Sequence, residues 1–213
     1  KRLRKKRRRQ KRKAKPRKNQ TKRRNNTKAD AASIGFFRLI VVFLNSKILI
    51  MHIQKATVAD LDVILNIIEE ARSIMRENGN TTQWTNGYPS SETILEDIAN
   101  DHAFVCIAAD EVVGYFCLML GDNPDPNYTT IEGNWLNESA YGVIHRLASA
   151  RTVKGIAQKA FDYAFTKTNN IRVDTLHENI PMQNFLKKNG FTYCGVIYVS
   201  DGTPRDAFQK VIS

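Results

Sequence analysis

The chain has 213 residues and a formal net charge of +12, from 33 Lys and Arg against 21 Asp and Glu. That length allows one domain with an appendage. Residues 1–50 carry 20 of the basic residues and one acid, whereas residues 51–213 carry 13 basic residues and 20 acids. The second part is therefore mildly acidic, which excludes a general attraction of that part for nucleic acid.

The first 50 residues read as a basic leader. Residues 1–32 are mostly Lys, Arg, Asn, Gln and Thr, a composition that cannot bury enough apolar surface to fold. Residues 34–44 are apolar, but Arg38 interrupts them and a membrane span needs about 20 residues. The leader can bind nucleic acid or ribosomes, can dock on an anionic membrane surface, or does not belong to the functional protein. We expect the last, because the ordered pattern begins at Met51.

From residue 51 the pattern is that of a mixed domain. Thr57 and Asp60 form a capping-box pattern that opens a helix, and Asn78-Gly79 ends it. Ser90 or Ser91 caps a second helix, and a strand-like stretch covers 128–135. Strands are predicted over 52–56, 103–108, 112–120, 141–149, 171–176, 191–199 and 206–211.

The three cysteines are an odd number without the spacing of metal ligands. All of them fall in strand-like runs, which favours buried, reduced thiols in a cytoplasmic protein and predicts no metal site. They are Cys106, Cys117 and Cys194.

The turn after the strand 141–149 has the features of an anion site. A helical period begins at Ile156, and the first turn of a helix has unpaired N–H groups and the positive end of its dipole. Arg151, Lys154 and Lys159 add positive charge, and Gly155 lacks a Cβ where a phosphate would come close. The pattern is neither a Walker loop nor a Rossmann fingerprint.

A second capped helix follows the strand 171–176. Asn179 suits an N-cap, Pro181 suits the first turn, and Gly190 suits a C′ stop. The order of strand, Lys154-Gly155-x-Ala157, helix, strand, Asn-capped helix and Gly190-Phe191 resembles the GCN5-related N-acetyltransferase (GNAT) family over roughly 51–213. Bacterial members are especially similar, through Gln83-Trp84, Tyr88-Pro89, His145-Arg146-Leu147-Ala148, Asp174-Thr175, Asn179, Met182-Gln183 and Gly190-Phe191.

The resemblance implies an α+β fold: a mixed, mostly antiparallel twisted sheet with helices on both faces and a splayed central strand pair. It implies acetyl transfer from acetyl-CoA, without a metal, to the primary amine of a small molecule or protein. The amine would attack directly in a ternary complex, and the protein could be a homodimer. The arm of CoA would lie between strands 141–149 and 171–176. The residues implied to contact it are Leu147, Ala148, Thr152, Val153, Lys154, Gly155, Ile156, Ala157 and Asn179.

The acceptor pocket is expected to involve Trp84, Tyr88 and Trp135, although core packing explains the first two equally well. Two positions depart from the family pattern. Thr152 stands where the family has Arg or Gln, and Leu186 stands where it has its acid tyrosine.

The catalytic groups therefore have to come from elsewhere. Tyr193, Tyr198 or water would protonate the leaving thiolate, and Glu132 or His145 would be the base. We expect an apolar setting for Glu132 and opposite faces of the strand for His145 and Arg146. His177 and Asp174 are expected to be structural.

The sequence also allows two alternative functions. The departures at Thr152 and Leu186 suit a non-catalytic acyl-CoA-binding module. The basic leader suits a nucleic-acid-binding protein whose affinity falls steeply with salt.

Overall fold

The computed structural model describes residues 50–213. The expectations about the basic leader, its apolar stretch and its nucleic-acid binding fall on residues that lie, except for Ile50, outside this part. Within residues 50–213, no helix is both long and apolar enough to cross a membrane.

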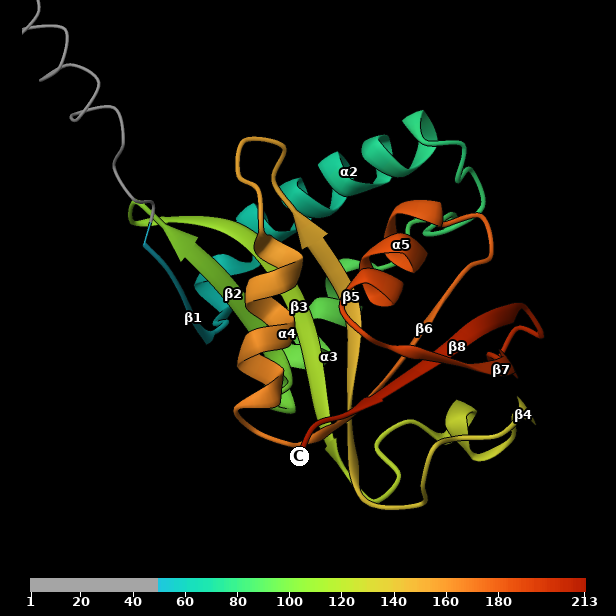
Figure 1. The fold of residues 1–213 in the computed structure, drawn as a ribbon. Helices are drawn as coiled ribbons and strands as arrows, with labels where there is room; N and C mark the ends of the chain where they lie inside the picture. The colour runs from blue at the N-terminus through green and yellow to red at the C-terminus, as the bar shows by residue number, and fades with distance from the viewer. Residues whose placement is uncertain (1–49) are drawn as a thin grey trace, which may run out of the picture. The chain divides into compact units, whose positions relative to one another are not determined.

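An eight-stranded sheet runs through the domain (Figure 1), with the strand order β1-β2-β3-β5-β6-β8-β7-β4. Every neighbouring pair is antiparallel except β5 and β6, which are parallel. The mixed, mostly antiparallel sheet is thus confirmed. The strands are β1 (Met51–Lys55), β2 (Ala103–Ala108), β3 (Glu111–Gly121), β4 (Glu132–Gly133), β5 (Tyr141–Ser149), β6 (Asn170–Thr175), β7 (Thr192–Tyr198) and β8 (Pro204–Val211).

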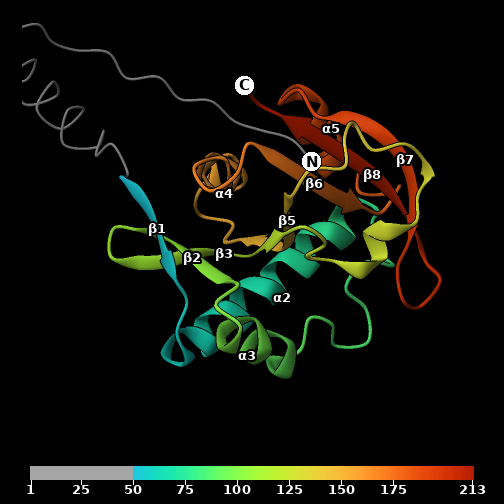
Figure 2. The same cartoon turned by 90° about the horizontal axis from the view of Figure 1, so that it is seen from below.

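Helices cover both faces of the sheet, as expected. Figure 2 shows α2 (Leu61–Glu77) and α3 (Ser91–Ala99) on one side and α4 (Ile156–Phe165) and α5 (Ile180–Lys188) on the other. Two 3₁₀ turns, η1 (Val58–Asp60) and η2 (Pro126–Thr129), complete the described elements. One apolar cluster joins α2 and α3 to the sheet, and another joins α4 and α5 to its other face. The three cysteines are buried and free, as predicted.

The helix ends follow the sequence signals. The Thr57–Asp60 capping box is present at η1, which leads directly into α2. The Ser90 hydroxyl accepts the N–H of Thr93 at 3.3 Å, and the Asn179 side chain accepts the N–H of Met182 at 3.2 Å. Such caps satisfy N–H groups that the first helical turn leaves unpaired.

The strand-like stretch over 128–135 is mostly irregular in the structure, so this prediction is wrong. Only Glu132–Gly133 forms a strand, and residues 126–129 form η2 instead. Asp125 caps η2 by accepting the N–H of Asn127 at 2.9 Å, and Pro126 fixes the backbone of the first turn. The segment therefore folds over the sheet as a cover that carries the buried ring of Tyr128.

The central strands separate soon after they begin. β5 and β6 are paired only at Gly142–Ile171 and Val143–Arg172. Further along β5, Arg146 and Leu147 lie between the pairs His145–Cys117 and Ala148–Tyr115, opposite a single residue of β3. This is a β-bulge, and Arg146 has a left-handed φ of 53° there.

The bulge overturns one expectation about side-chain direction. His145 shares a face with its cross-strand partner Cys117, and the Arg146 guanidinium donates to the sulfur of the same Cys117. The side chains of His145 and Arg146 therefore both project from the face covered by α2 and α3. Strict alternation predicts opposite faces, but an extra residue in left-handed conformation breaks the period of two.

Candidate active site

The turn before α4 is open toward solvent. Gly155 caps the helix with a φ of 88°, and no atom outside its chain neighbours lies within 4 Å of a Cβ built on it. Glycine is therefore favoured here by the left-handed backbone conformation. Crowding by neighbouring atoms is not the reason. Thr152 and Lys154 are exposed, and the first N–H groups of α4 have no acceptor in their own helix.

Arg151 faces away from this turn. Its guanidinium donates two hydrogen bonds to Glu77 at 2.6 and 2.8 Å, and its backbone N–H donates to Glu70 at 3.0 Å. Hydrogen bonding to Arg151 lowers the pKa of Glu77. Arg151 thus ties the turn to α2. Lys154 is exposed to solvent and has no ion pair in the described structure.

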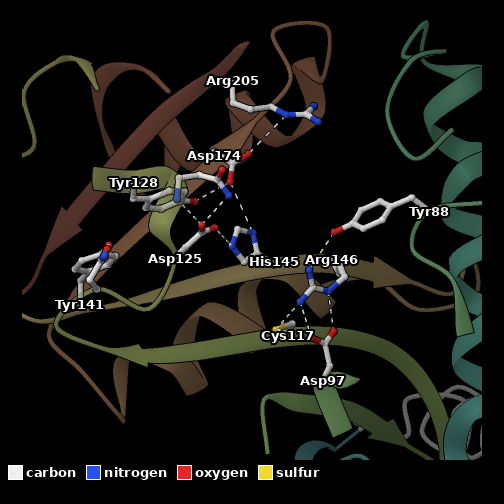
Figure 3. Close-up of polar contacts among 12 residues, drawn as sticks. Tyr88, Asp97, Cys117, Asp125, Tyr128, Tyr141, His145, Arg146, Asp174 and Arg205 are labelled. Atoms are coloured by element: carbon white, nitrogen blue, oxygen red, sulfur yellow. Dashed lines mark hydrogen bonds and ion pairs between the residues drawn. The ribbon is translucent and has the colours of Figure 1, made fainter. Parts of the chain in front are cut away.

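His145 lies between two carboxylates on the face covered by α2 and α3 (Figure 3). Its Nε2 is 2.7 Å from Oδ2 of Asp125, and its Nδ1 is 3.7 Å from Oδ1 of Asp174. Asp125 comes from the segment before η2, whereas Asp174 comes from β6 across the splayed strand pair. The side chain of His145 keeps 18% of its surface exposed, so the ring is not sealed from solvent.

Asp125 is held as a carboxylate. Burial alone would raise its pKa, but hydrogen bonds from His145 and Asn127 outweigh burial and lower the pKa of the Asp125 carboxyl. Asn127 donates both its backbone N–H, at 2.9 Å, and its side-chain amide, at 2.8 Å. The second carboxylate oxygen is therefore free to orient the imidazole of His145.

Tyr128 connects this pair to Asp174. Its hydroxyl donates to Asp174 at 2.7 Å, and its ring stands edge-on to His145 with centroids 6.1 Å apart. Burial, and then the charge of Asp174, raise the pKa of Tyr128 well above its ordinary value, so the phenol remains a donor. Arg205 of β8 approaches Asp174 from the other side, at 4.0 Å.

Arg146, the next residue along β5, makes a network that engages all three of its guanidinium nitrogens. It donates to both oxygens of Asp97 at 2.6 and 2.7 Å, to the Tyr88 hydroxyl at 3.0 Å and to Cys117 at 3.0 Å. The Tyr115 hydroxyl completes the shell of Asp97 at 2.6 Å. The pair joins α3 to the bulge of β5, beside His145 (Figure 3).

The loop between α2 and α3 borders this site. Tyr88 is 44% exposed and touches Arg146, whereas Trp84 packs against the apolar cluster of α2 and α3. Asn179 donates its amide to Gln83 of this loop at 2.9 Å. Asn179 therefore caps α5 and also fixes the loop, a second contact that the sequence does not reveal.

Two predicted catalytic residues, and the position where the family has its acid tyrosine, lie apart from His145. Glu132 is exposed on β4, where its carboxylate accepts from Tyr198 at 3.2 Å, so the expected apolar setting is wrong. Tyr193 packs edge-on against Phe208, which belongs to the apolar cluster under α4 and α5, on the other face of the sheet. Leu186 is fully buried in that cluster and contributes only packing.

The structure also places beside His145 and Arg146 residues that the sequence does not indicate as part of the site. Asp125 looked like part of a loop, and Asp174 was expected to be structural. Tyr128 was assigned to a strand, and Asp97 was not singled out. Their spacing along the chain does not indicate a common site, because they are brought together by the sheet register and by the fold of the segment 122–136 over the sheet.

Solved structures give the family. A GNAT-family acetyltransferase from Streptococcus agalactiae 2603 is 33% identical, with a TM-score of 0.69, and the match covers 76% of this chain and 96% of that one. The chain belongs to the GNAT acetyltransferase family. A candidate acetyltransferase from Staphylococcus aureus Mu50 is 29% identical over 76% of this chain and 99% of that one, with a TM-score of 0.56. Ard1 from Thermoplasma volcanium, at 15% identity and a TM-score of 0.52 over 76% of this chain and 98% of that one, shares the fold.

No protein-family model and no curated protein matches the chain. Its place in the GNAT family therefore rests on solved structures. GNAT proteins typically use acetyl-CoA and an acceptor substrate, and this GNAT chain has the corresponding fold. Residues 50–213 contain no cluster of three or more His, Cys, Asp or Glu side chains that could hold a metal ion.

Proposed function

We propose that this GNAT protein is an N-acetyltransferase that moves an acetyl group from acetyl-CoA to a primary amine by direct attack. The observation that carries the proposal is the position of His145. It lies on β5 beyond the last pair that joins β5 to β6, between the carboxylates of Asp125 and Asp174. A titratable group at the mouth of a strand wedge suits proton removal from an amine.

The residues around the wedge fit acetyl-CoA. A diphosphate can approach the backbone N–H groups of residues 153–157, because nothing lies within 4 Å of the missing Cβ of Gly155. Lys154 is exposed beside that turn and adds positive charge. When bound, acetyl-CoA supplies an activated acetyl thioester. The chain's own part is to place the acceptor amine beside it, which lowers the entropic cost of the reaction.

His145 acts as the base in this proposal. When Nε2 carries the hydrogen, it donates that hydrogen to Asp125, and Nδ1 has a free lone pair on the side of Asp174. An acceptor arrives mostly as an ammonium ion, since an amine like that of lysine has a pKa of about 10.4. Nδ1 takes its proton, and Asp125 and Asp174 stabilise the resulting imidazolium.

The bulge supplies the second element of catalysis. Because Arg146 and Leu147 together face one residue of β3, the regular strand pairing is interrupted at this point. We infer that the N–H of Leu147 is directed at the carbonyl oxygen as it gains negative charge. A positioned backbone donor of this type contributes about 100-fold or more to the rate.

A dedicated acid for the leaving group is not required. Leu186 is buried and cannot donate a proton, and Tyr193 lies on the other face from His145. A thiol with a pKa of about 8.5 leaves as a thiolate without much assistance. Water then protonates the thiolate, and the amine's second proton goes to solvent.

The acceptor can approach from the side of the α2–α3 loop and the β7–β8 hairpin. A cavity of about 390 Å³ opens there, and its lining includes Thr82 of the α2–α3 loop, His177, Arg205 and Asp206. Arg205, which lines this cavity, is 4.0 Å from Asp174, the carboxylate beside His145. Acids near such a mouth attract an ammonium group.

Thiol release with an amine panel tests the proposal. The full chain is mixed with acetyl-CoA and aliphatic amines, α-amines of short peptides, and aromatic amines, and free CoA is followed over time. We expect release with at least one class and its loss in His145→Gln. His52→Gln is the matched control, because His52 is exposed on β1. Release that survives in H145Q would remove His145 as the base.

A non-catalytic acyl-CoA-binding module is the second candidate, favoured by the buried Leu186 and by the pairing of Arg151 with Glu77. It predicts that CoA raises the melting temperature while no amine in the panel releases thiol. Protection by CoA together with thiol release would exclude it.

A further inference from the structure

Arg172 of β6 is a buried cation without a buried counter-charge. The residue is 3% exposed, and its guanidinium lies 4.0 Å from the ring centre of Tyr141 and 4.4 Å from that of Trp135. Nη2 donates to the backbone oxygen of Asn137 at 2.6 Å, while Nε is buried and has no acceptor among residues 50–213. Buried charges are costly unless they are paired and fully hydrogen-bonded.

The nearest carboxylate does not compensate this charge. Glu138 is 4.0 Å from Nη2, but its side chain is 90% exposed. An exposed carboxylate at that distance is partly screened by water, so it offsets only part of the buried charge. Burial correspondingly lowers the pKa of Arg172, which is the direction expected for a cation that lacks a partner.

A cavity adjoins this guanidinium. It has a volume of about 430 Å³, and Arg172 lines it together with the aromatic rings of Tyr128, Trp135 and Tyr141. Asp122 and Glu138 also line it and are exposed. The volume suits a small organic molecule. The lining thus combines aromatic side chains and one buried cation with two exposed acids, and these acids disfavour any negative charge beyond the one that Arg172 can compensate.

We propose that this cavity binds the carboxylate of a small monoanionic or zwitterionic molecule against Arg172. An arginine–carboxylate contact is a strong, charge-assisted hydrogen bond, and the stacked rings of Tyr141 and Trp135 hold the guanidinium in place for it. No other group within the described structure supplies this counter-charge in buried form.

The cavity lies next to the proposed active site. Tyr128 belongs to its wall and donates its hydroxyl to Asp174. Arg172 and Asp174 are two residues apart on β6 and share a face, which places their backbones about 7 Å apart. A carboxylate at Arg172 and an amine at Asp174 would therefore be separated by the length of a lysine side chain or a dipeptide. The carboxylate belongs either to the acceptor itself, a reading that rests on the proposed function, or to a separate molecule.

Calorimetry with a neutral isostere tests binding without any need for catalysis. N-acetylglycine and N-acetylglycinamide differ only in the charge of one group, and each is titrated into the full chain. We expect N-acetylglycine to bind at least 10-fold more tightly, and Arg172→Gln to abolish the difference. Equal binding of the two compounds, or no heat from either, would overturn the proposal. It would then follow that Arg172 only supports the fold.

Two further variants keep the test decisive if R172Q is unfolded. Glu138→Gln removes the exposed carboxylate 4.0 Å from Arg172 and should tighten N-acetylglycine binding 2- to 5-fold without affecting the amide. Glu111→Gln removes an exposed acid at the start of β3 and should change neither affinity. If E138Q and E111Q behave alike, the charge of the cavity is not involved and the proposal is wrong.

Kinetics distinguish the two sources of the carboxylate. Competitive inhibition by N-acetylglycine against the amine, with a lower KM for lysine than for lysinamide, assigns the cavity to the acceptor. Non-competitive inhibition assigns it to a separate molecule. If no amine is acetylated at all, the calorimetric result still stands, so failure of this inference is distinguishable from failure of the proposed transferase activity.

Discussion

His145 and Arg146 are neighbours in the chain, yet they sit in two different kinds of ionic cluster. Arg146 has a partner for each of its three nitrogens, and its counter-ion Asp97 is 6% exposed. His145 has one hydrogen bond, at 2.7 Å, while its second nitrogen is 3.7 Å from Asp174 and therefore free. A cluster in which every nitrogen is bonded holds a shape, whereas a cluster with a free lone pair can exchange a proton.

The bulge is what allows both clusters to exist side by side. Arg146 adopts a φ of 53°, which is unfavourable for a residue with a side chain by about 1–2 kcal/mol. The bidentate bond to Asp97 offsets that cost and directs Arg146 toward α3. His145 is left facing the splayed strands, where the acetyl group is proposed to arrive.

The largest effect on stability is expected from Asp97→Asn. The substitution keeps the shape but removes the charge that compensates the buried Arg146, so it should cost about 3–5 kcal/mol of unfolding free energy. Urea denaturation followed by circular dichroism measures it. Asp101→Asn is the matched control, because Asp101 lies just beyond α3 and its pair with Lys55 is exposed. That control should cost less than about 1 kcal/mol, and equal losses would show that the Arg146 cluster is not special.

For His145→Gln we expect the reverse of D97N, namely a large loss of activity and a small loss of stability. The ring carries out proton transfer in the proposed reaction, so its loss should lower kcat/KM by about 100-fold or more. Stability should change far less than in D97N, because only one hydrogen bond is lost. Initial rates and urea denaturation on the same samples give both numbers. A variant that unfolds as readily as D97N would place His145 among the structural residues.

The pH dependence of the unfolding free energy is expected to report on the His145 cluster through Asp125. The pKa of Asp125 is lowered in the folded protein, so its contribution to stability is present above the unfolded value of about 3.9 and is lost as the pH falls through the lower folded value. Asp125→Asn should therefore make the loss of stability below about pH 4 less steep. Unfolding free energies measured between pH 3 and 7 check this, and parallel curves for the two proteins would contradict it.

A double-mutant cycle shows which residue lowers the pKa of Asp125. If His145 is the main partner of Asp125, then H145Q should flatten the same acid limb, and the double variant H145Q/D125N should add little further. Additive effects would mean that Asn127 alone holds the carboxylate.

The sequence predicted most of what local chemistry decides. The caps at Thr57, Ser90 and Asn179 act through neighbours three residues away, and the apolar periods fix which face of each helix is buried. These features gave the order of elements and the family. Of the proposed centre, His145 was identified because its motif is local.

Its partners could not be predicted, for a physical reason. Asp125 lies 20 residues from His145, and Asp174 lies on the next strand of the sheet; their approach depends on the sheet register and on the fold of the loop before η2. One extra residue in β5 also reversed the direction expected for Arg146. A single bulge changes the face of the sheet to which each following side chain of the strand points. No residue type in the segment 141–149 signals that a bulge is present.

The smallest effect is expected at the edge of the Arg146 cluster, from Tyr88→Phe. The substitution removes one acceptor of Arg146, on a residue that is 44% exposed, so water can replace the hydroxyl. The cost should be about 0.5–1 kcal/mol. Tyr198→Phe, which removes an exposed hydroxyl bonded to Glu132, should cost about as little. If Tyr88 also touches the acceptor, then Y88F should raise the KM of the amine while the melting temperature stays nearly constant. A large stability loss with an unchanged KM would instead assign Tyr88 wholly to the support of Arg146.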